Sequence, residues 1–484
     1  MDPPLPHLIN QRAKQLAPRI PANYVPHDHR RTRTDGKHMP VSRRSFVTGM
    51  LAFSGAIAGC SSEGKRAGGS AGSTPSPSGN PQLPAEWDAY HRELERLAAE
   101  GSFSGAVLVA RGGKPILTRG YGMADRERGV LNDAATKFCI ASLGKPLTAV
   151  AIARLAETRK LAFDDPVGKH VPGLPAALSD KVTIHHLLTH TSGMGDVLEA
   201  GGADAPQTIA GLMSVIAAQP LGFEPGTRFR YSNSGFLTLG AVIEHVSGEP
   251  YADHMRRRVF DPAGMPDTEV RPYKPSEIPN MAHGYALIGP DGKLLPPGSA
   301  ENVRPSDATL RDISGDVQFA NPSGGAYSTV TDLFNFARGV SEHLLLGPET
   351  TKTLLAGRDF PDRGQGGQGG PGSPAAGRGA GGNGPGANGP AGGGAPDGNG
   401  PAGAGGSGGN GPAPSGPPPR YAYGFTDETH NGARIVGHNG GTPGYGGQLD
   451  VYLGRGDTVV ILSNQDGTGH ASAAATNSRA ILAP

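Results

Sequence analysis

Apolar residues along the chain follow helical spacing in some segments and extended patterns in others. Helical spacing, in which apolar side chains recur every three or four residues, predicts three helices. They cover residues 85–100, 142–158 and 236–246. The last of these ends at Gly248.

Short runs of β-branched and apolar residues predict strands near both ends of the chain. Residues 104–111 and 115–121 flank a Gly-Gly-Lys turn and are typical of a hairpin. Three further candidate strands near the C-terminus cover 434–438, 448–453 and 457–462. Strands at both ends with helices between them indicate one antiparallel sheet built from both ends of the chain, with an inserted helical region.

Composition singles out one segment. Glycine and proline make up 122 of the 484 residues, roughly twice average usage. Residues 364–419 hold 36 of them in 56 positions. Such a stretch cannot bury enough apolar surface to offset chain entropy, so we expect a disordered insertion in a surface loop.

Charge and cysteine content exclude several function classes. The 44 Lys and Arg residues balance 43 Asp and Glu residues, which leaves no basic footprint for nucleic acid. Two cysteines exclude a disulfide framework and a cysteine-type zinc site. Cys139 lies between Phe and Ile and is predicted to be a buried thiol.

The first sixty residues are typical of an export signal. The pair Arg43-Arg44 precedes an apolar run over 46–58, which is too short to span a bilayer as a helix but suits a signal peptide. The run ends in Ile-Ala-Gly-Cys, so Cys60 is a candidate lipidation site. We expect a twin-arginine-exported, membrane-anchored lipoprotein outside the cytoplasm; the alternative is a chance basic pair before an apolar stretch.

Domain boundaries follow from these shifts in composition. A Gly-, Ser- and Pro-rich linker is expected to separate the signal from one folded domain. The three parts are residues 1–60, 61–84 and 85–484. Met39 is a second candidate start, because the residues before it are polar and unpatterned.

The first candidate motif is Ser142-Leu143-Gly144-Lys145. A hydroxyl becomes a good nucleophile when a base takes its proton. Three residues are almost one helical turn, so Lys145 shares a face with Ser142. On a desolvated face a lysine can be partly neutral and act as that base. Alone, Ser-x-x-Lys occurs by chance in many proteins.

The second motif is Tyr231-Ser232-Asn233. In an extended segment, Tyr231 and Asn233 would point to the same side. A phenol near a lysine can have a lowered pKa and shuttle protons, and the asparagine amide can hold both substrate and lysine. The motif alone is equally explained by a polar turn.

The third motif, Gly437-His438-Asn439-Gly440-Gly441, follows a predicted strand. Glycines let a substrate approach the backbone closely. A main-chain amide here, paired with that of Ser142, could stabilise an oxyanion. Taken singly, the motif also fits a glycine-rich turn with a surface histidine.

In this order the three motifs resemble the serine β-lactamase and penicillin-binding protein superfamily, and within it the class C β-lactamase, DD-peptidase and esterase-like branch. Two secondary signatures agree, Leu-Leu-Thr-His-Thr-Ser-Gly at 187–193 and Gly-Gly-Ala-Tyr-Ser-Thr at 324–329. The resemblance covers about residues 95–470. It implies an α/β (α+β) fold, an antiparallel sheet flanked by helices plus a mostly helical region, with the serine in the cleft between them.

The resemblance also implies roles. Ser142 would form an acyl-enzyme, and Lys145 and Tyr231 together would activate it and later a water. Which of the two takes the proton stays open. Four residues would bind or orient substrate: Asn233, His438, Asn439 and Gly440. The amides of Ser142 and Gly441 would form the oxyanion hole. The implied activity is hydrolysis of a D-alanyl-type peptide, an amide or an ester, without cofactor or metal.

The third motif departs from the Lys-Thr-Gly expected of dedicated class C β-lactamases. Histidine is mostly neutral near pH 7 unless its pKa is raised, so recognition of a substrate carboxylate is expected to be weaker or pH-dependent. Two alternatives remain: a carboxylesterase without β-lactam recognition, and a penicillin-binding sensor that acylates without turnover.

Three histidines lie near the 187–193 signature. His186 and His190 are four residues apart and could share a helix face as metal ligands do. No His-Glu-x-x-His pattern accompanies them, so we expect His185, His186 and His190 to be structural and no metal to be bound.

Overall fold

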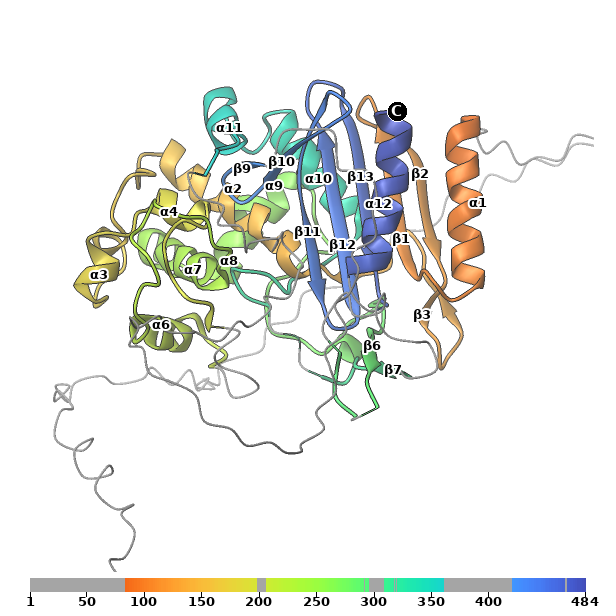
Figure 1. Cartoon of the computed structure of the whole chain (residues 1–484), viewed down its shortest axis with the longest axis horizontal. Helices are drawn as coiled ribbons and strands as arrows, with labels where there is room; N and C mark the ends of the chain where they lie inside the picture. Colours follow the sequence, from red (N-terminus) through yellow and green to blue (C-terminus); the bar gives the residue numbers. More distant parts are fainter. Residues whose placement is uncertain are drawn as a thin grey trace, which may run out of the picture. The chain divides into compact units, whose positions relative to one another are not determined.

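The computed structural model describes residues 83–197, 206–290, 292–295, 309–316, 318, 320–360, 420–465 and 468–484 (Figure 1). All of them belong to one compact unit, residues 78–484. The predicted signal, most of the linker, Cys60 and the glycine- and proline-rich insertion lie outside the described residues. In the described part, no helix is long and apolar enough to cross a membrane.

A seven-stranded antiparallel sheet is built from both ends of the described chain, as predicted. The strands lie in the order β2-β1-β13-β12-β11-β10-β9. They are β1 (Gly105–Arg111), β2 (Lys114–Tyr121), β9 (Arg420–Tyr421), β10 (Thr426–His430), β11 (Ala433–Thr442), β12 (Tyr445–Tyr452) and β13 (Asp457–Ser463). The first strand therefore pairs with the last.

The central strands are buried on both faces, which explains their continuous apolar sequences. In β1, Ala106 and Leu108 belong to the core cluster on one face, and Val107 and Val109 to the cluster on the other. This alternation is the two-residue period of a strand.

Helices cover both faces of the sheet. On one face lie α1 (Ala85–Ala99) and α12 (Thr468–Leu482). Trp87 is fully buried in the hydrophobic cluster on this face. A larger hydrophobic cluster on the opposite face joins the sheet to α2 (Gly144–Glu157), α10 (Val330–Ser341) and the helical region. The predicted α/β (α+β) fold is confirmed.

The helical region fills the chain between the two sets of strands. It contains α3 (Ala176–Ser179), α4 (Ile184–Leu188), α6 (Ile209–Ala217), α7 (Asn233–Ser247), α8 (Tyr251–Met255), α9 (Asp261–Ala263) and α11 (Pro348–Leu354). Three short pairs of strands complete the described fold: β3 (Met123–Asp125) with β4 (Val130–Leu131), β5 (Phe138–Cys139) with β8 (Tyr327–Ser328), and β6 (Tyr285–Ile288) with β7 (Thr309–Asp312).

Element boundaries differ from prediction at the motifs. Helix α7 begins at Asn233, capped by the Ser232 side chain, and ends at Gly248 with a φ of 72°. The Tyr-x-Asn motif is therefore a helix start and not an extended segment. Strand β11 continues through the third motif to Thr442, where Gly440 pairs with Gly447 and Gly441 with Gly446.

Candidate active site

Ser142 lies in a single 3-10 turn, η1 (Ala141–Leu143), which leads directly into α2. Ala141 before it has a φ of 42°, a left-handed conformation that costs a non-glycine residue about 1 kcal/mol or more. The turn places the hydroxyl at the head of a buried helix while leaving Ser142 partly exposed. A substrate can therefore reach it.

Lys145 lies in the first turn of α2 and its side chain contacts Ser142, as the spacing predicts. Its side chain is 0% exposed. The Nζ atom is 3.0 Å from Ser142 Oγ, 2.8 Å from Asn233 Oδ1 and 2.6 Å from the Ser323 carbonyl oxygen. The amine is thus held by three partners, of which Ser142 alone can also donate a proton.

Tyr231 approaches Ser142 from the loop before α7. Its hydroxyl lies 2.9 Å from Ser142 Oγ. Asn233, two residues on, is fixed by Asp196, whose carboxylate accepts from the Asn233 side-chain nitrogen at 2.8 Å and from its backbone N–H at 3.1 Å. This contact turns the Asn233 carbonyl oxygen toward Lys145.

Burial sets the protonation of both candidate bases. Desolvation lowers the pKa of Lys145 to about 7, and the negative charge of Asp196 opposes this only in part. Burial raises the pKa of Tyr231, opposed by its hydrogen bond to Ser142. The lowered phenol pKa suggested by the sequence is therefore wrong, because desolvation outweighs the hydrogen bond to Ser142.

The third motif brings β11 against the turn that carries Ser142. A Cβ added at Gly440 would lie 2.6 Å from the Ile140 carbonyl oxygen and 3.0 Å from the Ser142 amide nitrogen. Only a glycine permits this approach. It places the partly exposed backbone of Gly441 beside the serine turn, as an oxyanion hole requires.

His438 is 0% exposed, which differs from the substrate-facing position expected of it. Its Nε2 lies 3.0 Å from the Tyr421 hydroxyl, and its Nδ1 contacts the Asn439 carbonyl oxygen. Burial and the nearby Lys145 lower the pKa of His438 to about 3. The third-motif position therefore carries a neutral side chain inside the protein.

The three histidines in and just before the 187–193 signature make hydrogen bonds to other groups of the protein. Helix α4 ends at Leu188, so His186 and His190 do not share a helix face. His186 takes part in the capping box of α4, and His185 Nδ1 lies 2.9 Å from the Tyr423 hydroxyl. His190 is buried, and its Nδ1 accepts the Ser232 N–H at 3.1 Å. The described residues contain no group of three side chains that could hold a metal ion.

Cys139 is 1% exposed, as predicted, and burial raises the pKa of its thiol.

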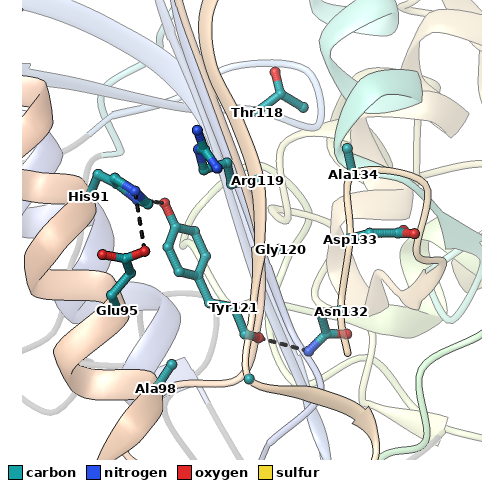
Figure 2. A pocket seen from close by; sticks show the side chains of 11 residues that line it. His91, Glu95, Ala98, Thr118, Arg119, Gly120, Tyr121, Asn132, Asp133 and Ala134 are labelled. Atoms are coloured by element: carbon teal, nitrogen blue, oxygen red, sulfur yellow. Dashed lines mark hydrogen bonds and ion pairs between the residues drawn. The ribbon is translucent and has the colours of Figure 1, made fainter. Parts of the chain in front are cut away.

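A cavity of about 440 Å³ lies away from the three motifs, between α1, β2 and the segment around Asn132 (Figure 2). It is lined by His91, Glu95 and Tyr121, and none of the motif residues borders it. The motif residues gather instead around Ser142, where Lys145 and Tyr231 both contact its hydroxyl.

The sequence motifs do not include three groups of the site: Asp196, the Ser323 carbonyl and Tyr421. Asp196 lies three residues after the 187–193 signature and Ser323 immediately before the 324–329 signature, so both signatures mark the site indirectly. Tyr421 follows the glycine- and proline-rich insertion, and no local pattern points to it.

Comparison with known proteins identifies a family for most of the chain. The family model described as Beta-lactamase matches residues 91–483. Putative penicillin-binding protein PbpX of Bacillus subtilis is 30% identical over 55% of this chain and 62% of its own length. Esterase EstB of Burkholderia gladioli is 32% identical over 55% of this chain and 72% of its own.

Two further similarities are informative. Teichoic acid D-alanine hydrolase of Staphylococcus aureus is 26% identical over 57% of this chain and 64% of its own. The crystal structure of a penicillin-binding protein from Bacillus halodurans aligns with a TM-score of 0.57 and 25% identity, over 80% of this chain and 98% of the other. The chain thus spans less than two thirds of the length of PbpX and of the D-alanine hydrolase.

Proposed function

Because the chain belongs to the Beta-lactamase family and is a serine hydrolase, we propose that it hydrolyses an ester or amide of D-alanyl type through an acyl-enzyme on Ser142. One observation carries the proposal: Ser142 Oγ lies 3.0 Å from a buried amine and 2.9 Å from a phenol. A hydroxyl held between two such groups has both a base and a proton donor at hand.

Lys145 is the base in this proposal. A neutral amine has two N–H bonds and one lone pair. The Asn233 carbonyl oxygen and the Ser323 carbonyl oxygen can only accept, so they take the two N–H bonds. The lone pair then faces Ser142, the remaining partner, whose proton it receives as Oγ attacks the carbonyl carbon.

Tyr231 is the proton donor. Because its pKa is raised, it is a neutral phenol at neutral pH, and its O–H points at Ser142 Oγ. When the tetrahedral intermediate collapses, Tyr231 gives its proton to the leaving oxygen or nitrogen and regains one from the Lys145 ammonium. In deacylation, a water loses a proton to this pair and attacks the ester carbonyl. The pair returns that proton to Ser142 Oγ as the acid is released. The amides of Ser142 and Gly441 hold the oxyanion in both steps.

The substrate class rests on the neutral third motif and on the relatives. A D-alanine hydrolase and an esterase are among the similar proteins, and the histidine offers no fixed cation for a substrate carboxylate. A second candidate, a carboxylesterase without D-alanyl preference, is favoured by the same neutral histidine. Both candidates use the same acyl-enzyme.

We also propose export. The order of Arg43-Arg44, the apolar run 46–58 and Cys60 supports a twin-arginine lipoprotein signal, and a D-alanyl substrate of the cell wall would lie outside the cytoplasm. In cells, Cys60→Ser is expected to release the protein from the membrane fraction. An unchanged distribution between fractions would contradict lipidation.

The activity is tested with a panel containing a D-alanyl ester, the matching L-alanyl ester, a D-amino acid amide and a penicillin. We expect turnover of the D-alanyl ester, with the Ser142→Ala variant inactive while folded. Equal rates for the D and L esters would favour the carboxylesterase, and a lasting penicillin adduct without turnover would favour a sensor. Full activity of Ser142→Ala would overturn the proposal.

A further inference from the structure

A chain of buried hydrogen bonds leads from a backbone amide to the third motif. The Ser232 N–H lies 3.1 Å from His190 Nδ1, and His190 Nε2 lies 3.1 Å from the Tyr421 hydroxyl. The same hydroxyl lies 3.0 Å from His438 Nε2. His190, Tyr421 and His438 are 1%, 2% and 0% exposed, so each hydrogen bond is made inside the protein.

The backbone amide sets the direction of every bond in this chain. An amide N–H can only donate, so His190 Nδ1 must accept, and the neutral ring carries its hydrogen on Nε2. That N–H donates to the Tyr421 oxygen. The Tyr421 hydrogen then points at His438 Nε2, which must accept. The hydrogen of His438 is left on Nδ1, where it meets the Asn439 carbonyl oxygen.

We propose that His190 and Tyr421 are positioning residues that hold His438 as the neutral Nδ1–H tautomer and thereby select substrates with an uncharged leaving group. Adding a proton at His438 Nε2 would set it against the Tyr421 hydrogen, which would then lack an acceptor in a buried site. The third-motif position therefore stays uncharged and gives no attraction to a carboxylate on the leaving side. The substrate part of this inference rests on the proposed function.

Burial and the neighbouring charges also favour the neutral form of His438. The titratable side chains facing it are Lys145 from α2, Tyr231 from the loop before α7, Tyr421 from β9 and His190 after α4. Burial and Lys145 lower the pKa of His438, and the Asn439 carbonyl opposes this without reversing it. Burial and Lys145 likewise lower the pKa of His190 well below its ordinary value.

Nuclear magnetic resonance of the ¹⁵N-histidine-labelled full chain tests the tautomer directly. We expect His438 to show one protonated and one unprotonated ring nitrogen, with hydrogen on Nδ1, unchanged from about pH 5 to pH 8. In Tyr421→Phe, His438 should lose this fixed pattern. Tyr423→Phe is the matched control, because Tyr423 is a buried tyrosine that contacts His185 and lies outside this chain of hydrogen bonds. A wild-type His438 with hydrogen on Nε2, or with two protonated nitrogens near neutral pH, would overturn the proposed tautomer.

The consequence for substrates is tested with 4-nitrophenyl acetate and its 3-carboxy analogue, which carry the same acyl group. Wild type should prefer the uncharged ester by about tenfold in kcat/KM across that pH range, because the carboxylate of the analogue loses water at the site without gaining a charged partner. Tyr421→Phe should narrow this preference at the acidic end, with a change in the KM of the carboxylated ester that is larger than the change in its kcat. A preference that is unaltered in Tyr421→Phe at every pH would overturn the link to specificity. Turnover surviving in Ser142→Ala would instead refute the proposed function and leave the tautomer result standing.

Discussion

At the scale of single residues, the proposed mechanism makes the reaction depend on the protonation of Lys145. The base form is the unprotonated amine, which is present above the pKa of about 7. We therefore expect kcat/KM to fall about tenfold per pH unit below pH 7 and to level off above it. Because the pKa of Tyr231 is raised, no loss of activity from phenol ionisation is expected just above neutrality. A pH–rate profile that rises only near pH 10 would mean that Lys145 is an ordinary lysine.

Asp196 tunes that pKa. Its carboxylate opposes the effect of burial on Lys145 and accepts two hydrogen bonds from Asn233. In Asp196→Asn the charge is lost, while the amide oxygen can still accept from Asn233. The inflection of the pH–rate profile should therefore move to lower pH. Asp180→Asn, an exposed aspartate that contacts Ser179, is the control and should leave the profile unchanged. A shift to higher pH in Asp196→Asn would contradict the assigned electrostatics.

At the scale of secondary-structure elements, the contact between β11 and the serine turn depends on Gly440. A side chain there would collide with backbone atoms of Ile140 and Ser142, so Gly440→Ala must push the strand away from the turn. We expect kcat/KM to fall by about 100-fold, the scale of losing one oxyanion-hole donor. Gly315→Ala, where an added Cβ meets nothing within 4 Å, should be silent. An active Gly440→Ala would show that the oxyanion is held elsewhere.

The docking of α12 on the sheet depends on a buried ion pair. Arg479 of α12 donates to the Asp450 carboxylate of β12 at 2.6 and 2.8 Å, and Asp450 is fully buried. Arg479→Leu leaves a buried charge without its cation, and we expect the free energy of unfolding to fall by about 3 kcal/mol. Denaturant unfolding measures this, with Arg96→Ala in the exposed pairs of α1 as a nearly neutral control. Unaltered stability of Arg479→Leu would refute the role assigned to the pair.

Whether an element could be predicted depended on how local its signal was. The hairpin at the start, the strands at the end and the Ser-x-x-Lys spacing depend on neighbouring residues, and the structure confirms them. The extension of β11 through its glycines was missed, because glycine is rare in strands and is tolerated here only by close packing. Asp196 and Tyr421 reach the site through the tertiary fold, from positions 37 and 17 residues away from the partners they hold.

At the scale of the whole molecule, the glycine- and proline-rich insertion is predicted to be dispensable. The chain on either side of it is paired: the Arg358 N–H donates to the Tyr421 carbonyl oxygen at 3.0 Å, and Arg420 contacts Asp359. A short turn can therefore close the gap. Deleting residues 364–419 should leave kcat/KM within about twofold. A large loss of turnover in a folded deletion variant would assign the insertion a part in the site.

The most direct measurement is rapid-quench intact mass of the full chain during turnover of a D-alanyl ester, followed by peptide mapping. The proposed mechanism predicts a transient gain of one acyl group per chain, located on Ser142, and no such gain in Ser142→Ala. An adduct on another residue, or undiminished turnover in folded Ser142→Ala, would contradict this mechanism.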